Sequence, residues 1–489
     1  LAGLSSDDGK PHSKFYGAAG GGTAIEAAVL RPSIARRVEN AAPETAERPF
    51  EIELEGPWIS QPVRELPALT PSGGALGKPA EINPIRHEDL WDAEGNRFGT
   101  RNPEIVDPLA AKSVNPGGAR TPAPLHDYEG LTNTQGYYPP DPHGAVGPSH
   151  YIQVVNVKFR VFNKDGTPAD AEHNTNTLFS ALGGGCATNN NGDAIFMYDE
   201  KADRWLLSQF SVSTTPRKVC VAISQTPDPL GSYYLYSLTT QRFPDYFKFG
   251  IWPDPTYNAF FMTTNSGYAN QYDVYALDRE NMLLGATARA AQYFQSYPNL
   301  LMPADFDGTT MPPAGTGGLF YTILDGTDPY FVPSPGVDTM RVYEYKVNWT
   351  TPASSTFNQV AAYTPSSGGL AAFNWSVCGF FEQNCLSQPG TGVRIDSASW
   401  WPMQRLVYRN FGPHESLYGT WTVDVTGTPD LAAPRWFELR RTGGTGGSWT
   451  IYQQGTYSPD GDHRWMGSIA ADRDGNIALG YSVVNAATT

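Results

Sequence analysis

Acidic residues recur at corresponding places in a series of apolar segments. Carboxyl groups that converge around a channel could bind a cation. They could also act as general acid and base on a glycosidic bond, where one acid protonates the leaving oxygen and another activates water or attacks the sugar. The leading acids are Asp141, Asp193, Asp245, Asp305 with Asp307, Asp396 and Asp462.

Histidine and arginine stand near some of these acids, at places where the other segments have no counterpart. A histidine and an arginine among carboxylates could abstract a proton and neutralise a uronate, which is lyase chemistry. The additional residues are His143 after Asp141, the pair His463 and Arg464 after Asp462, and Arg409 followed by His414 and Glu415 in "LVYRNFGPHESLYG".

Tryptophans form a third group of candidates, because an aromatic ring lies well against the apolar side of a pyranose. These are Trp252, Trp400, Trp401 and Trp465. We take Asp141, His143, Asp193, Asp396, His463 and Arg464 as candidate catalytic residues. We take Asp245, Trp252, Arg409, His414, Glu415 and Trp465 as candidate binding residues.

Each of these features also has a structural interpretation. An Asp ahead of a strand commonly caps a turn by accepting hydrogen bonds from backbone amides. Tryptophan rings commonly pack between sheets, and the loop with His414 reads equally well as an ordinary charged surface loop. Residues that break the repeat are therefore more informative than the repeat, which directs attention to His143 and to His463, Arg464 and Trp465.

Short aromatic and β-branched segments must position these side chains. From about residue 128 they follow one another with Gly, Pro, Asp or Asn between them, as in "YIQVVNVKFRVF", "RWLLSQFSV" and "NAFFMTT". The leading acids are spaced by 52, 52, 60, 91 and 66 residues. A period of about 40 to 60 residues with roughly four strands per unit is typical of propeller blades. We predict an all-β, six-bladed propeller, and the 91-residue step leaves room for a seventh blade.

Composition agrees with this fold and limits the partners. Of 489 residues, 17% are charged and 12% aromatic, and 50 Gly and 41 Pro suit short strands joined by tight turns. The formal net charge of −15 argues against a nucleic-acid groove or an anionic membrane surface. A polysaccharide or another neutral or cationic extracellular ligand fits better, and the oligomeric state stays open.

Four cysteines indicate an oxidising compartment. None forms a C-x-x-C pair, so we expect two disulfides, Cys186 with Cys220 and Cys378 with Cys385, although three pairings exist and free cytosolic thiols are the alternative. No apolar stretch approaches the roughly 20 residues of a membrane helix. Since no signal peptide opens the chain, we expect a secreted protein in its mature form.

The first 125 residues differ from the rest. They are rich in Pro, Gly, Ala and Glu, and contain one helix candidate, "TAIEAAVLRPSIARRVENAA", and one strand candidate, "FEIELEG". We expect this segment to wrap the propeller of residues 126–489. Because the last unit ends after two strands, "FEIELEG" could supply a strand that closes it.

Several phrases resemble those of a family of large secreted bacterial proteins, predicted β-propellers without an assigned activity. The phrases include "DPHGAVGPSHYIQVVN", "DEKADRWLLSQF" and "DHRWMGSIAADRDGNIALGYS", and the resemblance covers about residues 128–485. It implies a propeller outside the cell and supplies no catalytic residues. In that family a further strand with a "SIRY" core follows; it is absent here, so the resemblance implies that this chain has been clipped.

Other motifs narrow the function. The turns "NKDGTP", "DFDGTT" and "DRDGN" resemble the start of a calcium loop but lack the Glu at position twelve, so hairpin turns explain them while calcium remains an open cofactor. The sequence has no G-x-S-x-G, H-E-x-x-H, Walker or Rossmann motif. Two functions stay open: a carbohydrate-active enzyme, either glycoside hydrolase or polysaccharide lyase, or a non-catalytic extracellular binding or surface-structural module.

Overall fold

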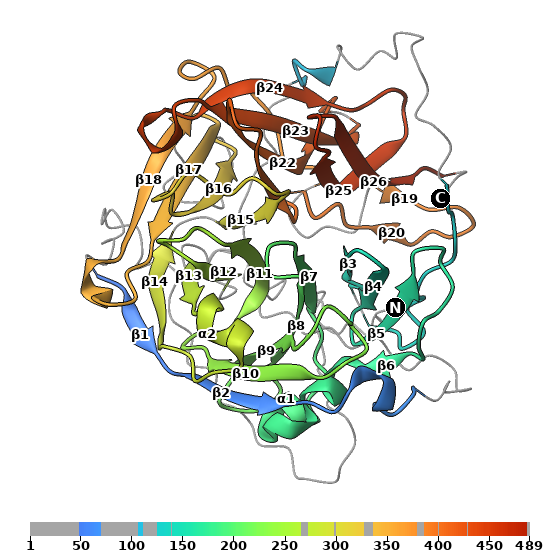
Figure 1. Ribbon diagram of the computed structural model, residues 1–489. Coiled ribbons are helices and arrows are strands. Elements are labelled where there is room, and N and C mark those ends of the chain that lie inside the picture. The colour runs from blue at the N-terminus through green and yellow to red at the C-terminus, as the bar shows by residue number, and fades with distance from the viewer. Residues whose placement is uncertain are drawn as a thin grey trace, which may run out of the picture. The chain divides into compact units, whose positions relative to one another are not determined.

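The chain folds as a β-propeller in the part that the computed structural model describes. The described residues are 48–69, 106–110, 125–137, 139–265, 272–297, 300–326, 336–378, 386–399, 401–427 and 429–486, and all of them belong to one compact unit, residues 40–489. Six antiparallel blades are arranged around a centre, with β3, β7, β11 and β15 facing it (Figure 1). Among these residues no helix is long and apolar enough to span a membrane.

The first three blades each contain four strands in chain order, with the first strand innermost. Blade 1 consists of β3 (Pro142–Val146), β4 (His150–Val155), β5 (Lys158–Asn163) and β6 (His173–Asn174). Blade 2 consists of β7 (Ile195–Asp199), β8 (Arg204–Ser211), β9 (Lys218–Ser224) and β10 (Tyr233–Thr239). Blade 3 consists of β11 (Asp245–Trp252), β12 (Ala259–Asn265), β13 (Tyr272–Leu277) and β14 (Ala291–Tyr297).

Blades 4 and 5 are joined through their innermost strands. Blade 4 consists of β15 (Met302–Asp307), β16 (Gly318–Leu324), β17 (Thr339–Lys346) and β18 (Thr356–Tyr363). Blade 5 consists of β21 (Leu406–Asn410), β22 (Glu415–Asp424), β23 (Ala432–Arg441) and β24 (Thr450–Thr456). Only Met302 and Pro303 pair with β16; from Ala304 onward β15 runs parallel to β21, so that Asp307 lies opposite Arg409. This pairing brings acids of blade 4 beside arginines of blade 5.

The last blade has two described strands, β25 (His463–Ala471) and β26 (Ile477–Val484), as the sequence predicts. The long 91-residue step between units contains only a small sheet of β19 (Leu386–Ser387) and β20 (Arg394–Ile395) outside the strands of blade 4. Within the described residues this step therefore adds no seventh blade.

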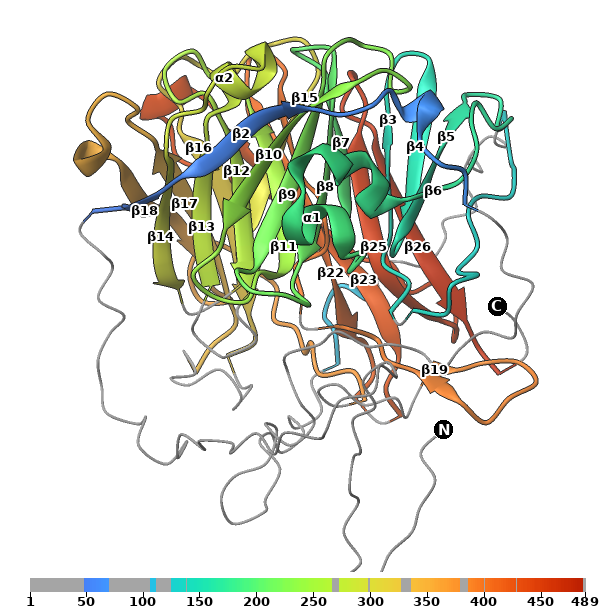
Figure 2. The same ribbon diagram turned by 90° about the horizontal axis from the view of Figure 1, so that it is seen from below.

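The segment "FEIELEG" does not close the last blade. It forms β1 (Phe50–Ile52) and the start of β2 (Leu54–Ile59), which pair with β14 of blade 3 and β10 of blade 2 as fifth, outermost strands. Figure 2 shows β2 crossing in front of these blades. The outer edges of β14 and β10 offer unpaired backbone groups, which an added strand satisfies. The predicted helix over residues 23–42 lies outside the described residues.

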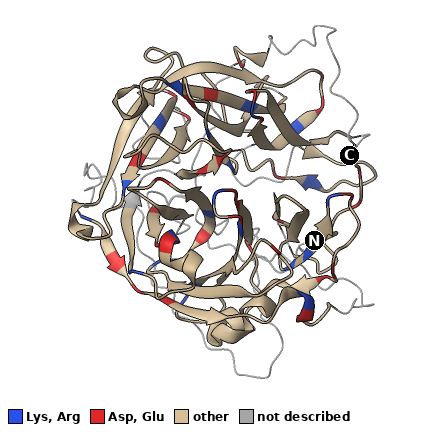
Figure 3. Cartoon of the chain, viewed as in Figure 1, with Lys and Arg blue, Asp and Glu red and all other residues tan. Residues whose placement is uncertain are grey.

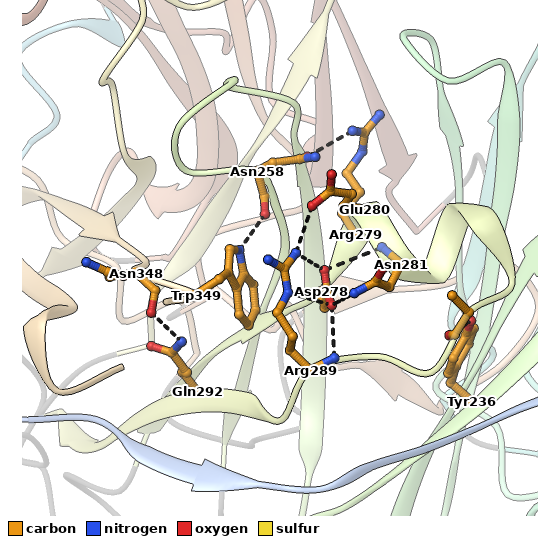
Figure 4. Close-up of polar contacts among 11 residues, drawn as sticks. Tyr236, Asn258, Asp278, Arg279, Glu280, Asn281, Arg289, Gln292, Asn348 and Trp349 are labelled. Atoms are coloured by element: carbon orange, nitrogen blue, oxygen red, sulfur yellow. Dashed lines mark hydrogen bonds and ion pairs between the residues drawn. The ribbon is translucent and has the colours of Figure 1, made fainter. Parts of the chain in front are cut away.

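Short helices and polar contacts fasten neighbouring blades. Helix α2 (Arg279–Leu284) follows β13, and Asp278 caps it while accepting hydrogen bonds from the Arg289 guanidinium (Figure 4). Arg289 lies 4.8 Å from the ring of Trp349, which follows β17 of blade 4, and Trp349 donates a hydrogen bond to the backbone of Asn258 in blade 3. These contacts link blade 3 to blade 4.

The predicted disulfide between Cys186 and Cys220 is confirmed. It ties α1 (Gly184–Thr188) to β9, and both cysteines are buried. Cys378 is also disulfide-bonded, while Cys385, its expected partner, lies outside the described residues.

A buried ion pair fixes part of the N-terminal segment to blade 5. Asp107 accepts a hydrogen bond of 2.5 Å from Arg435 of β23, and both side chains are fully buried. Asp107 also accepts one from Thr456, and its backbone N–H donates to Val425. Asp107 therefore supplies a counter-charge and a hydrogen-bond acceptor to the Arg435 guanidinium, which is buried inside blade 5.

We predict that Asp107→Ala lowers the free energy of unfolding by about 3–5 kcal/mol, because it leaves the Arg435 charge buried without its partner. Urea unfolding followed by tryptophan fluorescence measures this. Asp165→Ala, in an exposed hairpin, is the control. If the charge is the cause, the double variant Asp107→Ala/Arg435→Met regains part of the loss; an equal or larger loss in the double variant contradicts this explanation.

Candidate functional site

Three of the predicted acids come together at the centre of the propeller. Asp141, Asp193 and Asp245 lie at or just before the starts of β3, β7 and β11, the innermost strands of blades 1 to 3. Each side chain interacts electrostatically with the others and with Lys248 of β11. All three acids are half-buried and so keep contact with solvent. We call Asp141, Asp193, Asp245 and Lys248 the central cluster.

The backbone around the central cluster adopts the left-handed conformation at non-glycine residues. Asp141, Asp193 and Tyr246 have φ values of 40°, 47° and 44°. This conformation is costly for residues with a side chain and is often found at functional sites. Ala398 and Met466 share it near the inner parts of blades 5 and 6, so it belongs partly to the repeat. Among the described residues, only those of the first three blades combine it with interacting carboxyl groups.

Lys248 lies among the three acids without an ion pair. Its Nζ donates a hydrogen bond of 3.2 Å to the carbonyl of Phe247 and lies 3.5 Å from the centre of the Tyr246 ring. No carboxylate of the described residues lies within 4.0 Å of this Nζ, although the acids are near enough to shift its pKa. Lys248 therefore lies near the three acids without being paired to any of them.

Burial controls the protonation of the central cluster. It raises the pKa of Asp141 and of Asp245 well above the usual range, and the neighbouring Asp193 adds to both shifts. The pKa of Asp193 rises to about 6, because burial outweighs the opposing effects of Lys248 and the Tyr246 backbone amide. Burial lowers the pKa of Lys248 to about 8 against the effect of the acids. In all four groups burial thus favours the uncharged form over the charged one.

Asp141 and Asp193 interact directly. A hydrogen bond between their carboxyl groups requires one of them to be protonated, and this contact raises the pKa of Asp141. This arrangement differs from simple turn capping, which Asp396 does perform by accepting from the backbone N–H of Ala398 at 2.9 Å.

His143 presents one ring nitrogen to solvent beside this cluster. Its Nδ1 accepts a hydrogen bond of 3.3 Å from the backbone N–H of Phe196 in β7, so the proton of the neutral ring is on Nε2. Burial, with Lys248 and Arg405, lowers the pKa of His143 to about 3. Nε2 has no described protein partner and is not buried. His143 is therefore a neutral donor near the centre.

A second polar group forms where β15 and β21 pair. Arg405 donates to both Asp307 oxygens at 2.7 and 2.6 Å and also to Asp305, whose other oxygen accepts from the backbone N–H of Ile251. Burial raises the pKa of Asp305 to about 7. Arg409 lies 4.0 Å from Asp307. Asp305 and Asp307 lie within β15 and not ahead of it, and Figure 3 shows charged residues at the centre as well as on the rim.

His463, Arg464 and Trp465 are not brought to the central cluster by any described contact. The Nδ1 of His463 accepts from the backbone N–H of Ala432 at 3.2 Å. Arg464 is hydrogen-bonded to Asp460 and lies beside two tyrosine rings that contact each other. Trp465, 8% exposed, packs in a small apolar cluster with Val377 and Val484. All three side chains make contacts within the fold, so a structural role explains why this segment differs from the other repeat units.

The remaining candidates also have internal partners. Glu415 is buried and paired with Arg441, and His414 stacks on Phe411. Trp252 is fully buried and Trp401 is 7% exposed, so neither offers a face to a sugar; Trp400 lies outside the described residues. With Trp465 at 8%, all three described tryptophans of this group are buried, and packing covers the ring faces that stacking on a sugar requires.

Sequence reasoning missed Lys248, Tyr246 and Arg405. Lys248 stands in "DYFKFGIW", where it is the one cation and is flanked by Phe on both sides, and that contrast is a signal the sequence contains. Arg405 is near its acids only because β15 and β21 pair across blades, about 100 residues apart in sequence. In the described part of the chain, no three or more His, Cys, Asp or Glu side chains are placed to hold a metal ion.

The sequence matches no protein-family model and no curated protein. Among solved structures, it is similar to one from Agrobacterium tumefaciens described as a TolB protein. The two chains are 12% identical, with a TM-score of 0.32, and the match covers 70% of this chain and 90% of the other.

We predict that Asp141→Asn stabilises the protein at pH 8. The folded protein raises the pKa of Asp141 above its unfolded value near 3.9, so its carboxyl opposes folding increasingly as the pH rises above about 4. An amide carries no such charge. We expect the Tm at pH 8 to rise by about 2 °C or more, and the gain to vanish below about pH 4. Thermal unfolding at both pH values measures this, with Asp165→Asn as control; a pH-independent change contradicts it.

A second prediction concerns the tautomer of His143. In the full chain with ¹⁵N-labelled histidine, long-range ¹H–¹⁵N spectra are expected to show the Nε2–H form, unchanged between pH 8 and pH 5, because the pKa of His143 is about 3. The signal that His143→Gln removes identifies it. Titration of this signal near pH 6.5, or the Nδ1–H form, would show that the assigned hydrogen bond to Phe196 is wrong.

Proposed function

We propose that the protein is an extracellular hydrolase that acts on an uncharged, polyhydroxylated substrate, a neutral polysaccharide first of all, at the centre of its propeller. One observation carries the proposal: three half-buried carboxyl groups lie near one ammonium, that of Lys248, and none of them forms an ion pair with it. Groups that serve only to hold strands together would pair directly, as Arg405 and Asp307 do.

The protonation states suggest a division of roles. The raised pKa of Asp245 favours its protonated form, which suits the general acid that protonates the leaving oxygen. Asp193 is ionised above about pH 6 and suits the base or nucleophile, with Asp141 as the partner that contacts it directly. Because Asp141 and Asp193 are hydrogen-bonded, they act as one unit, and the second carboxyl that glycoside hydrolysis needs is Asp245.

The charges favour a hydrolase over a lyase for uronate polymers. A lyase needs cations that neutralise the uronate carboxylate. In the centre Arg405 is engaged by Asp305 and Asp307, and Lys248 is surrounded by three acids. Sugar hydroxyls both donate and accept, so they match a mixed set of carboxyls, ammonium and the Nε2–H of His143.

A location outside the cytosol forms part of the proposal. The buried disulfide between Cys186 and Cys220 supports it, because such bonds persist in oxidising compartments. The resemblance of residues 128–485 to secreted bacterial propellers points the same way.

A non-catalytic binding or surface-structural role is the second candidate. It is favoured by the burial of Trp252 and Trp401 and by the internal partners of Arg464 and Glu415, which leave few of the expected ligand contacts free. In this case the central cluster binds a saccharide without cleaving it, or serves only the fold.

The test is release of reducing ends from neutral polysaccharides, such as starch, xylan, β-glucan and mannan, by the purified full chain. Activity is expected to rise with pH through about 6, as Asp193 ionises. Asp193→Asn and Asp245→Asn are expected to lower kcat by about 10²–10⁴-fold, since each removes a proton-transferring group.

Asp165→Asn, on an exposed hairpin, is the matched control and keeps full activity. Circular dichroism and Tm confirm that the variants fold. Release of unsaturated ends from uronate polymers would support the lyase alternative. Absence of cleavage on all polymers overturns the hydrolase proposal, and saccharide binding that persists would then support the binding module.

A further inference from the structure

Lys248 differs from the other enclosed lysines in its partners. Lys158 and Lys218 form ion pairs with Glu172 and Glu55, at 2.8 and 2.5 Å. Lys248 is only 8% exposed, but its ammonium has a single hydrogen bond, to the carbonyl of the preceding residue. An ammonium that is removed from water and has no ion-pair partner is poorly stabilised, so the neutral amine is favoured.

Titratable groups face Lys248 from three strands. Asp141 and His143 come from blade 1, Asp193 comes from blade 2, and Asp245 precedes Lys248 on β11 itself, with the Tyr246 ring beneath the Nζ. Burial lowers the pKa of Lys248 to about 8 even though the acids oppose the shift. A reactive lysine needs a neutral amine and a nearby proton donor, and the central cluster supplies both.

We propose that Lys248 is a nucleophilic lysine that forms an imine with an aldehyde, either a small aldehyde or the open-chain aldehyde of a reducing sugar, at the centre of the propeller. This activity uses the same cluster but does not depend on glycoside hydrolysis. The low exposure of Lys248 restricts it to carbonyl groups at the end of a slender chain.

The chemistry balances with groups of the chain. The lone pair of the neutral Nζ amine attacks the carbonyl carbon, and one N–H proton passes to the carbonyl oxygen to give a neutral carbinolamine. A protonated carboxyl of Asp141 or Asp245 then gives its proton to the hydroxyl, which leaves as water while the nitrogen lone pair forms the C=N bond, so that a protonated imine and a carboxylate result. Hydrolysis reverses both steps, so no oxidant or reductant is needed.

The experiment traps the imine in the full-length protein. Glyceraldehyde and sodium cyanoborohydride are added between pH 6 and pH 9.5, and the reduced adduct is mapped by peptide mass spectrometry. At pH 7.5 an amine of pKa about 8 has a neutral fraction roughly 200-fold larger than one of pKa about 10.4. We expect Lys248 to be modified faster than the exposed Lys164, with a midpoint near pH 8, and the ion-paired Lys158 to remain unmodified.

Lys248→Arg keeps the charge and removes the nucleophile, so the adduct disappears from this peptide only. If that variant fails to fold, the site mapping in the unaltered protein still decides the matter. Modification of Lys164 without modification of Lys248 overturns the proposal. Polysaccharide cleavage is measured separately, so this result and failure of the proposed hydrolase activity are distinguishable.

Discussion

The innermost strands β3, β7 and β11 each have one edge that faces the centre and lacks a strand partner, and the backbone groups on that edge need hydrogen bonds. The structure supplies them from neighbouring blades. His143 of blade 1 accepts from Phe196 of blade 2, Asp305 of blade 4 accepts from Ile251 of blade 3, and β15 pairs directly with β21. Polar and titratable side chains therefore lie at the centre because the backbone there requires hydrogen-bond partners.

The same requirement produces the conditions for chemistry. Carboxyl groups placed at the centre lose much of their hydration, so burial raises the pKa of Asp141, Asp193 and Asp245 and lowers that of Lys248. These shifts oppose folding near neutral pH, because the charged forms would be better solvated in the unfolded chain. Arg405, by contrast, forms ion pairs with both Asp305 and Asp307. The central cluster resembles a functional site because its charges remain unpaired at a cost to stability.

Contacts outside the centre hold the inner strands in place. The N-terminal strands β1 and β2 extend blades 3 and 2, and Asp107 anchors a later part of that segment on Arg435 of blade 5. The Asp278–Arg289 network with Trp349 links blade 3 to blade 4. Because these contacts lie on the periphery, they stabilise the ring without occupying the central cluster.

The sequence by itself determined the propeller, the two strands of the last unit and the carboxyl residues of the central cluster, because alternation, turn residues and a repeat period are local properties of the chain. It also predicted the bond between Cys186 and Cys220. Only the tertiary structure decided which candidates meet. Arg464 and Glu415 found partners within their own blades, while Lys248, inconspicuous in sequence, came to lie among three acids from successive blades. The physical reason is that strand pairing within a blade joins residues close in sequence, whereas packing between blades brings together residues about 50 to 100 positions apart. Their charges shift one another's pKa strongly only in the enclosed centre, where water screens them least.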